Sequence, residues 1–497
     1  MQGRQMWRSV LAGLLLIQGA WLAAPVRAAP FMVQSGQPRA EIVVSDNPAR
    51  MTKWAARELQ EYVKKISGAE LPIVVEPTGR AARIYVGVSE HTRRLGLEVS
   101  DLKDGAYRMA SGDNWLALLG PDGDYVPTEP WGRNRSRPEQ QRILAEWDRI
   151  TGDLFNSPFL THFRHYYPDP EFWDTVGDRG TGPGHPSPTE HAGVWSFDEA
   201  GTLNAVQAFL HELGVRWYAP GEIGEVVPQR TDIALPQVDR VVRPDFPLRF
   251  FQYGYAQHGM GDVGVWNLRL GFNPGGRIVG HVQLCHGLKF VLMRPEMREA
   301  HPEIYALMRG ERHEVAPCLS SETLFEKHVA YVRAMFDHYN EPMVNIDLPD
   351  GFGPGCECER CLPQRTPERG RDGLVSDLVF AYLDRVAREV YKSHPDRMVG
   401  ALAYSSYRLP PLKIDQLSPN LALTWSRAAK RRTMYQDRDE VADYLRLRDE
   451  WLAKLPSKCL IMWESYLNAE PKGRALPAVF PRAIAEDIRG LKGLSVG

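Results

Sequence analysis

Residues 344–361 read VNIDLPDGFGPGCECERC, and this stretch decides how the chain is interpreted. Val344 and Ile346 share one face of the predicted β-strand and Asp347 lies on the other, because side chains alternate along a strand. A turn rich in glycine and proline follows, and it begins at Asp350. A buried strand that ends in carboxylates is typical of α/β folds, in which functional groups gather where parallel strands end.

The chain from residue 248 onward contains further strands of this kind, and amphipathic helical segments separate them. The predicted strands are Leu248–Tyr253, Gly280–Leu284, Ala316–Leu319, Met343–Leu348, Val399–Tyr404, Leu421–Trp425, Leu460–Trp463 and Gly493–Val496. Eight strands that alternate with helices predict a (β/α)8 TIM-like barrel. No helix follows the last strand, so we expect an incomplete barrel or a fragment of a longer protein.

The N-terminal half predicts a smaller α+β domain. Glu41–Val44 has the composition of a strand, and the helix after it begins at Asn47-Pro48 and ends at Gly68. Apolar periodicity fades over 121–193. We therefore expect an α+β domain made of residues 29–120 and 194–247, and a barrel made of residues 248–497. Residues 121–193 are expected to be an insertion that shapes the cleft.

The first 28 residues are expected to be a signal peptide. Arg4 and Arg8 precede the apolar run Val10–Ala24, and Val26–Ala28 resembles a cleavage site. The run is short for a membrane span, and a retained anchor is the alternative. We expect a secreted or periplasmic protein with no membrane span after signal removal.

Composition and charge narrow the class of protein further. Hydrophobic residues make up 43% of the chain and charged residues 25%, which is typical of a globular protein with a buried core. The formal net charge of −2 does not favour nucleic acid or an anionic membrane as the main partner.

The C-x-C-x-x-C motif at the end of the quoted stretch predicts a metal site, because a tight turn lets two thiolates face one zinc ion. The expected ligands are Cys356, Cys358, Cys361 and, from the loop after the neighbouring strand, Cys318. Cys285 or His286 is the next candidate for the fourth position. We expect a structural zinc ion that fixes the loop carrying Asp350. Disulfides are the alternative in an exported protein, followed by free thiols and by a thiolate nucleophile tuned by zinc.

Polar and aromatic residues follow several predicted strands, where barrel enzymes build their active sites. Glycoside hydrolysis needs two carboxyl groups, and we expect Asp350 as the acid and Glu464 as the base or nucleophile. Asp347 is the substitute for Asp350. The expected substrate contacts are Tyr253, His286, Asp347, Tyr404, Trp425 and Tyr466. The alternative is that Asp350 only forms a turn and Glu464 only an ion pair.

Several stretches resemble an exported bacterial family of uncharacterised proteins related to glycoside hydrolases. The matching stretches are ARELQEYVKKISGAELPIV, RIYVGVS, GTLNAVQAFLHELGVRWYAPGEIGEVVP, HPEIYALMRGER, CLSSE and LPDGFGPGCECERC. The resemblance implies an α-glucuronidase N-terminal-like domain followed by a barrel of unassigned function. It also implies an architecture like that of α-glucuronidases and β-N-acetylhexosaminidases, and so a carbohydrate substrate.

The expected function is therefore that of an exported glycoside hydrolase acting on a poly- or oligosaccharide. The basic run KRRTMYQDR (430–438) favours acidic sugars such as uronates. The alternative is a non-catalytic glycan-binding or surface-assembly protein on a degenerate barrel. No organic cofactor is expected.

Overall fold

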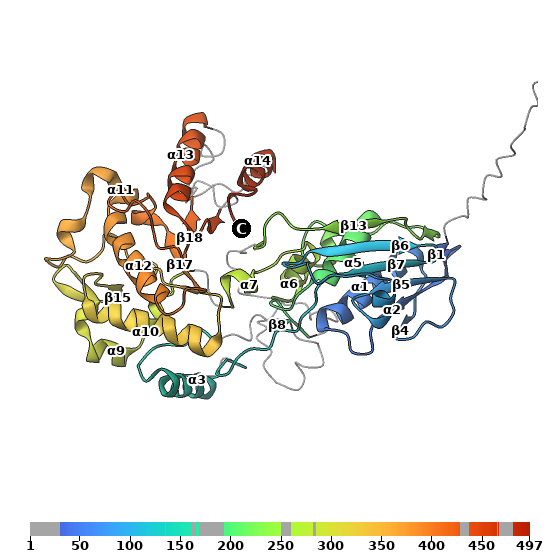
Figure 1. Cartoon of the computed structure of the whole chain (residues 1–497), viewed down its shortest axis with the longest axis horizontal. Coiled ribbons are helices and arrows are strands. Elements are labelled where there is room, and N and C mark those ends of the chain that lie inside the picture. Colours follow the sequence, from blue (N-terminus) through green and yellow to red (C-terminus); the bar gives the residue numbers. More distant parts are fainter. Residues whose placement is uncertain are drawn as a thin grey trace, which may run out of the picture.

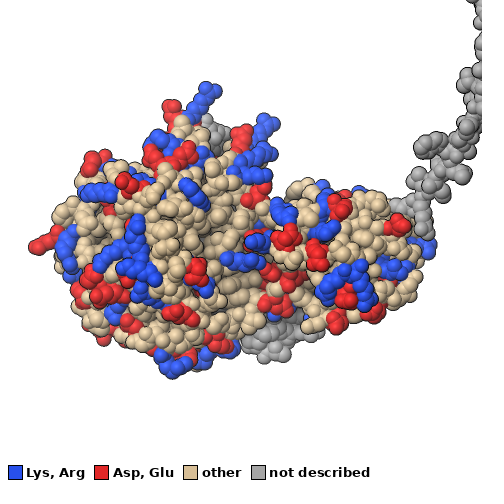
Figure 2. All heavy atoms as spheres, viewed as in Figure 1, with Lys and Arg blue, Asp and Glu red and all other residues tan. Residues whose placement is uncertain are grey.

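The computed structural model of the protein describes residues 30–134, 136–160, 166–167, 193–249, 260–281, 285–427, 437–464, 466 and 481–497 (Figure 1). Three predicted features lie outside these residues: the expected signal peptide, most of residues 161–193 of the insertion, and Tyr253. Among the described residues, no helix is both long and apolar enough to span a membrane. Figure 2 shows acidic and basic side chains interspersed over the visible face, as the small net charge predicts.

The N-terminal half is built on a six-stranded mixed sheet, on the right of Figure 1. In spatial order its strands are β13 (Asp239–Val242), β6 (Tyr107–Gly112), β7 (Trp115–Leu119), β5 (Ala82–Val86), β3 (Ala40–Val43) and β4 (Ile73–Val74). Strands β4, β3, β5 and β7 are parallel, and β6 and β13 are antiparallel to their neighbours.

Two long helices, α1 (Arg50–Ser67) and α5 (Gly201–Glu212), contribute apolar side chains to the same core as this sheet. Helix α1 ends at the predicted residue, because Gly68 adopts a φ of 77° that only glycine tolerates easily. The shorter elements of this half are β1 (Phe31–Gln34), β2 (Gln37–Pro38), α2 (Glu90–Arg94), β8 (Tyr166–Tyr167), β9 (Val194–Trp195), β10 (Arg216–Trp217), β11 (Glu225–Val226) and β12 (Ile233–Ala234).

The C-terminal half is built on a four-stranded parallel sheet, which forms the core that carries the candidate site. Its order is β16 (Met343–Asn345), β17 (Met398–Ala403), β18 (Leu421–Ser426) and β19 (Leu460–Trp463). The helices that precede the strands or connect them are α10 (Glu322–Tyr339), α12 (Ser376–Tyr391) and α13 (Arg438–Lys454). These four strands and the helices between them are where the sequence predicts them.

The fold is mixed α/β, and the parallel strands that the structure describes do not form a closed barrel. Ala316–Leu319 is wrong as a barrel strand, because it overlaps β15 (Glu311–Pro317), which pairs antiparallel with β14 (Tyr305–Met308). Arg309 and Gly310 both have positive φ, so a two-residue turn folds the chain into a hairpin.

The last predicted strand, Gly493–Val496, is not a regular strand, although it lies beside β19. The backbone N–H of Val496 donates to the carbonyl oxygen of Leu460 at 2.8 Å, and the N–H of Leu248 donates to Val496 at 2.9 Å. The C-terminal residues thus bridge β19 and Leu248, the first residue of the expected first strand.

Part of the insertion packs on the C-terminal half. Helix α3 (Arg137–Thr151) buries Trp147 in the same core as β16. The hydroxyl of Tyr339 on α10 donates to the carbonyl oxygen of Pro130 at 2.7 Å. Helix α6 (Met260–Arg269) contributes Val265 and Leu268 to the core of the N-terminal half. The further α-helices described in the C-terminal half are α7 (Gly276–Val279), α8 (Lys289–Leu292), α9 (Pro295–Ala300), α11 (Gly370–Gly373) and α14 (Pro481–Leu491).

Candidate active site and metal centre

Asp347 lies just after β16, at the end where the parallel strands present their functional groups. The residue is fully buried, and burial raises the pKa of its carboxyl group to about 7. Its Oδ1 accepts a hydrogen bond from the backbone N–H of Gly287 at 3.4 Å. Among the described residues no donor pairs with Oδ2. A carboxyl group that is partly protonated near neutral pH has the property that a general acid needs.

His286 is held beside this carboxyl group in a strained conformation. Its backbone φ is 62°, which is uncommon for a residue with a side chain. Its Nδ1 lies 2.7 Å from the carbonyl oxygen of Leu348 and 3.8 Å from Oδ2 of Asp347. Because a carbonyl oxygen only accepts, Nδ1 carries the proton, which leaves Nε2 as the acceptor of the neutral ring.

Gly287 lets this segment lie directly against β16. A Cβ atom at Gly287 would stand 1.7 Å from the carbonyl oxygen of Asn345, a distance that no side chain can occupy. The N–H of the next residue, Leu288, donates to the carbonyl oxygen of Asp347 at 2.9 Å. Residues 285–288 are therefore fixed to the strand end on which Asp347 lies.

Asp350 and two tyrosines complete what we call the strand-end cluster: His286, Asp347, Asp350, Tyr404 and Tyr407. Asp350 is exposed, and burial and the nearby carboxylate of Asp350 together raise the pKa of Tyr404. The pKa of Tyr407 is raised well above its usual value by burial, and then by the charges of Asp347 and Asp350. The loops after β16 and β17 thus bring an accessible carboxylate and a buried one together.

Glu464 lies at the end of β19 in a different group. Its side chain is 6% exposed, and its Oε1 lies 3.9 Å from Nη1 of Arg427. Arg427 also pairs with Asp487 of α14 at 3.0 Å, and the hydroxyl of Tyr466 donates to Asp487 at 2.8 Å. The alternative in which Glu464 forms an ion pair is therefore realised.

The expected substrate contacts do not all reach this edge of the sheet. Trp425 is fully buried and stacks on Tyr444 of α13 at 5.3 Å, so its ring faces the helix layer and not the loops. This placement does not favour contact with a substrate. Tyr253 lies outside the described residues. Sequence reasoning missed Asp487, because α14 lies far along the chain from Glu464.

The two groups of carboxylates lie on opposite edges of the parallel sheet, with β17 and β18 between them. Three strand spacings correspond to about 14 Å along a flat sheet. Glycoside hydrolases hold their two catalytic carboxyl groups about 5–10 Å apart. Asp347 and Glu464 can therefore act on one bond only where the curvature of the sheet and the length of the side chains bring their carboxyl groups closer together than the strands are.

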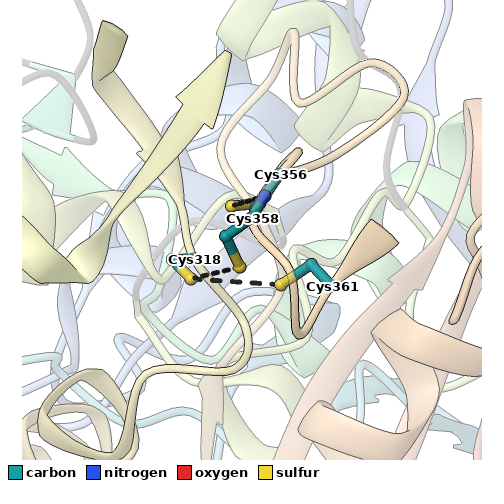
Figure 3. Close-up of side chains that lie close together, drawn as sticks. All are labelled: Cys318, Cys356, Cys358 and Cys361. Carbon is teal, nitrogen blue, oxygen red and sulfur yellow. Dashed lines mark hydrogen bonds between the residues drawn. The ribbon is translucent and has the colours of Figure 1, made fainter. Parts of the chain in front are cut away.

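Four cysteines form a second candidate centre next to the strand-end cluster (Figure 3). Their sulfur atoms all lie within 4.8 Å of one another, and the residues are Cys318, Cys356, Cys358 and Cys361. Sγ of Cys318 is 3.8 Å from that of Cys358 and 3.9 Å from that of Cys361. None of these four cysteines forms a disulfide bond. Cys318 lies beside the motif, and that these four cysteines bind a metal stays a prediction.

Two hollows of the described surface are lined by residues that belong to neither group. One of about 500 Å³ is lined by the N-terminus of α1 and by Asp122. Burial raises the pKa of Asp122 to about 6, and its carboxylate accepts hydrogen bonds from Thr52 and Thr202. Another of about 660 Å³ is lined by residues of α11 and α13.

Comparisons with known proteins give one family and several distant structures. The model of a domain of unknown function, DUF4838, matches residues 218–496. No curated protein matches the sequence. A family GH115 4-O-methyl-α-glucuronidase, with specificity for decorated arabinogalactans, is 12% identical with a TM-score of 0.44; the match covers 93% of this chain and 53% of that one. This chain therefore spans about half the length of that enzyme.

Two family GH20 enzymes are similar at the same level. The β-N-acetylhexosaminidase of Streptomyces coelicolor A3(2) is 10% identical with a TM-score of 0.34, and the match covers 88% of this chain and 72% of that one. The chitobiase of Flavobacterium johnsoniae is 10% identical with a TM-score of 0.40, and the match covers 91% and 61%.

Proposed function

The chain belongs to the DUF4838 family of domains of unknown function, and on that premise we propose that it is a glycoside hydrolase that cleaves an O-glycosidic bond with carboxyl groups. The observation that carries the proposal is the pair of carboxyl groups after β16. Asp347 is buried with a pKa of about 7, and Asp350 is exposed beside Tyr404. One side chain is suited to hold a proton and the other to meet a sugar hydroxyl.

Asp347 is the proton donor in this proposal. The sequence ranks Asp350 first and Asp347 as its substitute, and the environment of the two groups reverses that order. Asp350 is exposed to water, whereas burial keeps Asp347 protonated up to neutral pH. Because Asp347 is fully buried in the free chain, the mechanism requires that substrate binding uncovers it from the side of His286.

Glu464 is the ionised partner, with Arg427 stabilising its negative charge. It acts on the anomeric carbon as a nucleophile, or on water as a base, while Asp347 donates a proton to the leaving oxygen. Tyr404 and His286 bind hydroxyl groups of the substrate.

Other parts of the proposal rest on the sequence. The chain is exported, because of its N-terminal segment, and the basic run 430–438 selects acidic sugars.

A non-catalytic glycan-binding protein is the second candidate function. Two observations favour it: Asp347 is fully buried, and Glu464 is already paired with Arg427. A binding protein needs neither a titrating acid nor a second carboxylate.

The test is release of reducing sugar from a panel of polysaccharides and aryl glycosides, uronides included. The variants are Asp347→Asn, Asp350→Asn and Glu464→Gln. Asp122→Asn is the matched control, because Asp122 is also buried with a raised pKa but lies in the N-terminal half. We expect Asp347→Asn and Glu464→Gln to abolish release and Asp122→Asn to retain it. Retention on a glycan column without release by the wild type would favour the binding protein.

A further inference from the structure

We infer that Cys318, Cys356, Cys358 and Cys361 together bind one Zn²⁺ ion, which joins the loop after β16 to the β14–β15 hairpin. Cys318 follows β15, and the other three cysteines lie in the loop that begins at Asp350. The inference is independent of the proposed function, because it rests on the positions of the sulfur atoms.

The spacing of the sulfur atoms matches a single tetrahedral ion. A zinc–sulfur bond of about 2.3 Å in a regular tetrahedron places the sulfur atoms about 3.8 Å apart. Sγ of Cys318 lies 3.8 Å from Cys358 and 3.9 Å from Cys361. Disulfide-bonded sulfur atoms would be about 2.0 Å apart, and none of these four cysteines is in a disulfide bond. The group is therefore a ligand set and not a pair of disulfide bonds.

The surroundings of the cluster suit thiolates. The backbone N–H of Leu307 donates to Sγ of Cys356 at 3.2 Å, and the N–H of Cys358 donates to the same sulfur at 3.4 Å. The hydroxyl of Ser320 lies 3.0 Å from Sγ of Cys361. Four thiols that bind Zn²⁺ release their protons and leave a net charge of −2, which such donors stabilise.

The loop is folded so that its cysteines converge. Gly351, Gly353 and Gly355 have φ values of 82°, 62° and 82°, which allow tight coiling before the motif. The N–H of Cys361 then donates to the carbonyl oxygen of Cys358 at 3.1 Å, so the C-x-x-C segment forms a turn with both sulfur atoms near Cys318.

The ion is structural and not catalytic. Three of the four cysteines are buried, and four thiolates leave no coordination position for an activated water. The loop is also tied to β14, because the N–H of Glu357 donates to Leu307 at 2.8 Å and the N–H of Arg309 donates to the Glu357 side chain at 2.7 Å. The zinc ion therefore holds the loop that carries Asp350 in place.

The test is the metal content of the purified full-length chain. We expect about one zinc per chain, and a fall of at least about tenfold in Cys356→Ser and Cys361→Ser. Cys459→Ser is the matched control, because Cys459 is buried outside the cluster. This variant is expected to contain as much zinc as the wild type. Cys358→Ser is the milder variant, since Cys358 is the least buried of the four.

Two measurements on the wild type need no variant. Replacement of zinc by Co²⁺ is expected to give the absorption of a tetrahedral cobalt–thiolate site. Removal of the metal under denaturing, non-reducing conditions is expected to expose all six thiols. Zinc below about one tenth of an equivalent with fewer free thiols would overturn the inference in favour of disulfides. One iron per chain in place of zinc would overturn the choice of metal.

Discussion

The imidazole ring of His286 lies 3.8 Å from the carboxyl group of Asp347, and His286 reaches this position with a backbone φ of 62°. The strain of a left-handed histidine is of order 1–3 kcal/mol and persists only where the surrounding structure imposes it. Here the hydrogen bond to Leu348 and the contact of Gly287 with β16 impose it. A strained residue beside a buried carboxyl group with a raised pKa supports the proposal that this strand end is the functional one.

Replacement of His286 by glycine separates strain from function. His286→Gly is expected to leave stability unchanged or raise it by about 1 kcal/mol, because glycine adopts a positive φ without cost, and to lower hydrolysis at least about tenfold. The measurements are the urea midpoint and the rate of sugar release. Asn340→Gly is the control, since Asn340 ends α10 with a φ of 54°. It is expected to keep full activity, and equal activity loss in both variants would contradict the assignment.

Replacement of Asp347 by asparagine is expected to stabilise the protein in a pH-dependent way. The pKa of an unfolded aspartate is about 4, and burial raises that of Asp347 to about 7 in the folded chain. Between these values the folded chain binds a proton that the unfolded chain lacks, so wild-type stability falls as pH rises from about 4 to 7. Asp347→Asn removes this loss. The variant is expected to be as stable as the wild type at about pH 4 and more stable by on the order of 1–4 kcal/mol above about pH 7.

Thermal unfolding between about pH 4 and 8 measures this gain. Asp122→Asn is the comparison, and its gain is expected to be complete by about pH 6, because the pKa of Asp122 is about 6. A stability difference between Asp347→Asn and wild type that does not change with pH would show that Asp347 is ionised in the folded chain.

Addition of one methyl group at Gly287 is expected to disrupt the site. The new Cβ would stand 1.7 Å from the carbonyl oxygen of Asn345, so the backbone has to move. Gly287→Ala is expected to cost about 1–3 kcal/mol and most of the activity. Gly490→Ala on α14 is the control, because nothing lies within 4 Å of its Cβ position. The measurement is the free energy of unfolding from urea titrations. A Gly287→Ala variant that is as stable as the wild type would contradict the packing of Gly287 against β16.

The buried guanidinium of Arg427 is expected to be important for stability. Arg427→Met leaves Glu464 and Asp487 without their shared cation, and such losses cost about 3–5 kcal/mol. Arg446→Met is the matched control, because Arg446 is 55% exposed and its pairs with Asp443 and Glu450 contribute less than about 1 kcal/mol. Similar unfolding midpoints for the two variants would show that the Arg427 pairs do not stabilise the fold.

Much of the C-terminal sheet could be predicted from the sequence. Strands β16 to β19 are short apolar segments between amphipathic helices, and that pattern has few other interpretations. The β14–β15 hairpin was missed, because its turn uses Arg309 in a positive-φ conformation instead of the usual asparagine or aspartate.

The candidate site was predicted less completely than the sheet. The three cysteines of the motif were grouped by their spacing, whereas Cys318 lies beside them because it follows β15 of a hairpin and not the barrel strand that was expected. The orientation of Trp425 could not be predicted, because all six residues of β18 are buried and composition does not show which of them face the helices. The different burial of Asp347 and Asp350 depends on His286 and Gly287, which lie about 60 residues away in the chain, and sequence spacing carries no information on that contact.

The assignment of Asp347 as the acid is tested by the pH dependence of kcat/KM for the best substrate of the panel, measured for the wild type and for Asp347→Asn. We expect wild-type kcat/KM to fall as pH rises above about 7, because the free chain then loses the proton on Asp347. Asp347→Asn is expected to lack both the activity and the decrease above about pH 7. Wild-type activity that persists unchanged to about pH 9, or an Asp347→Asn variant that keeps the wild-type rate, would contradict the assignment of Asp347 as the acid.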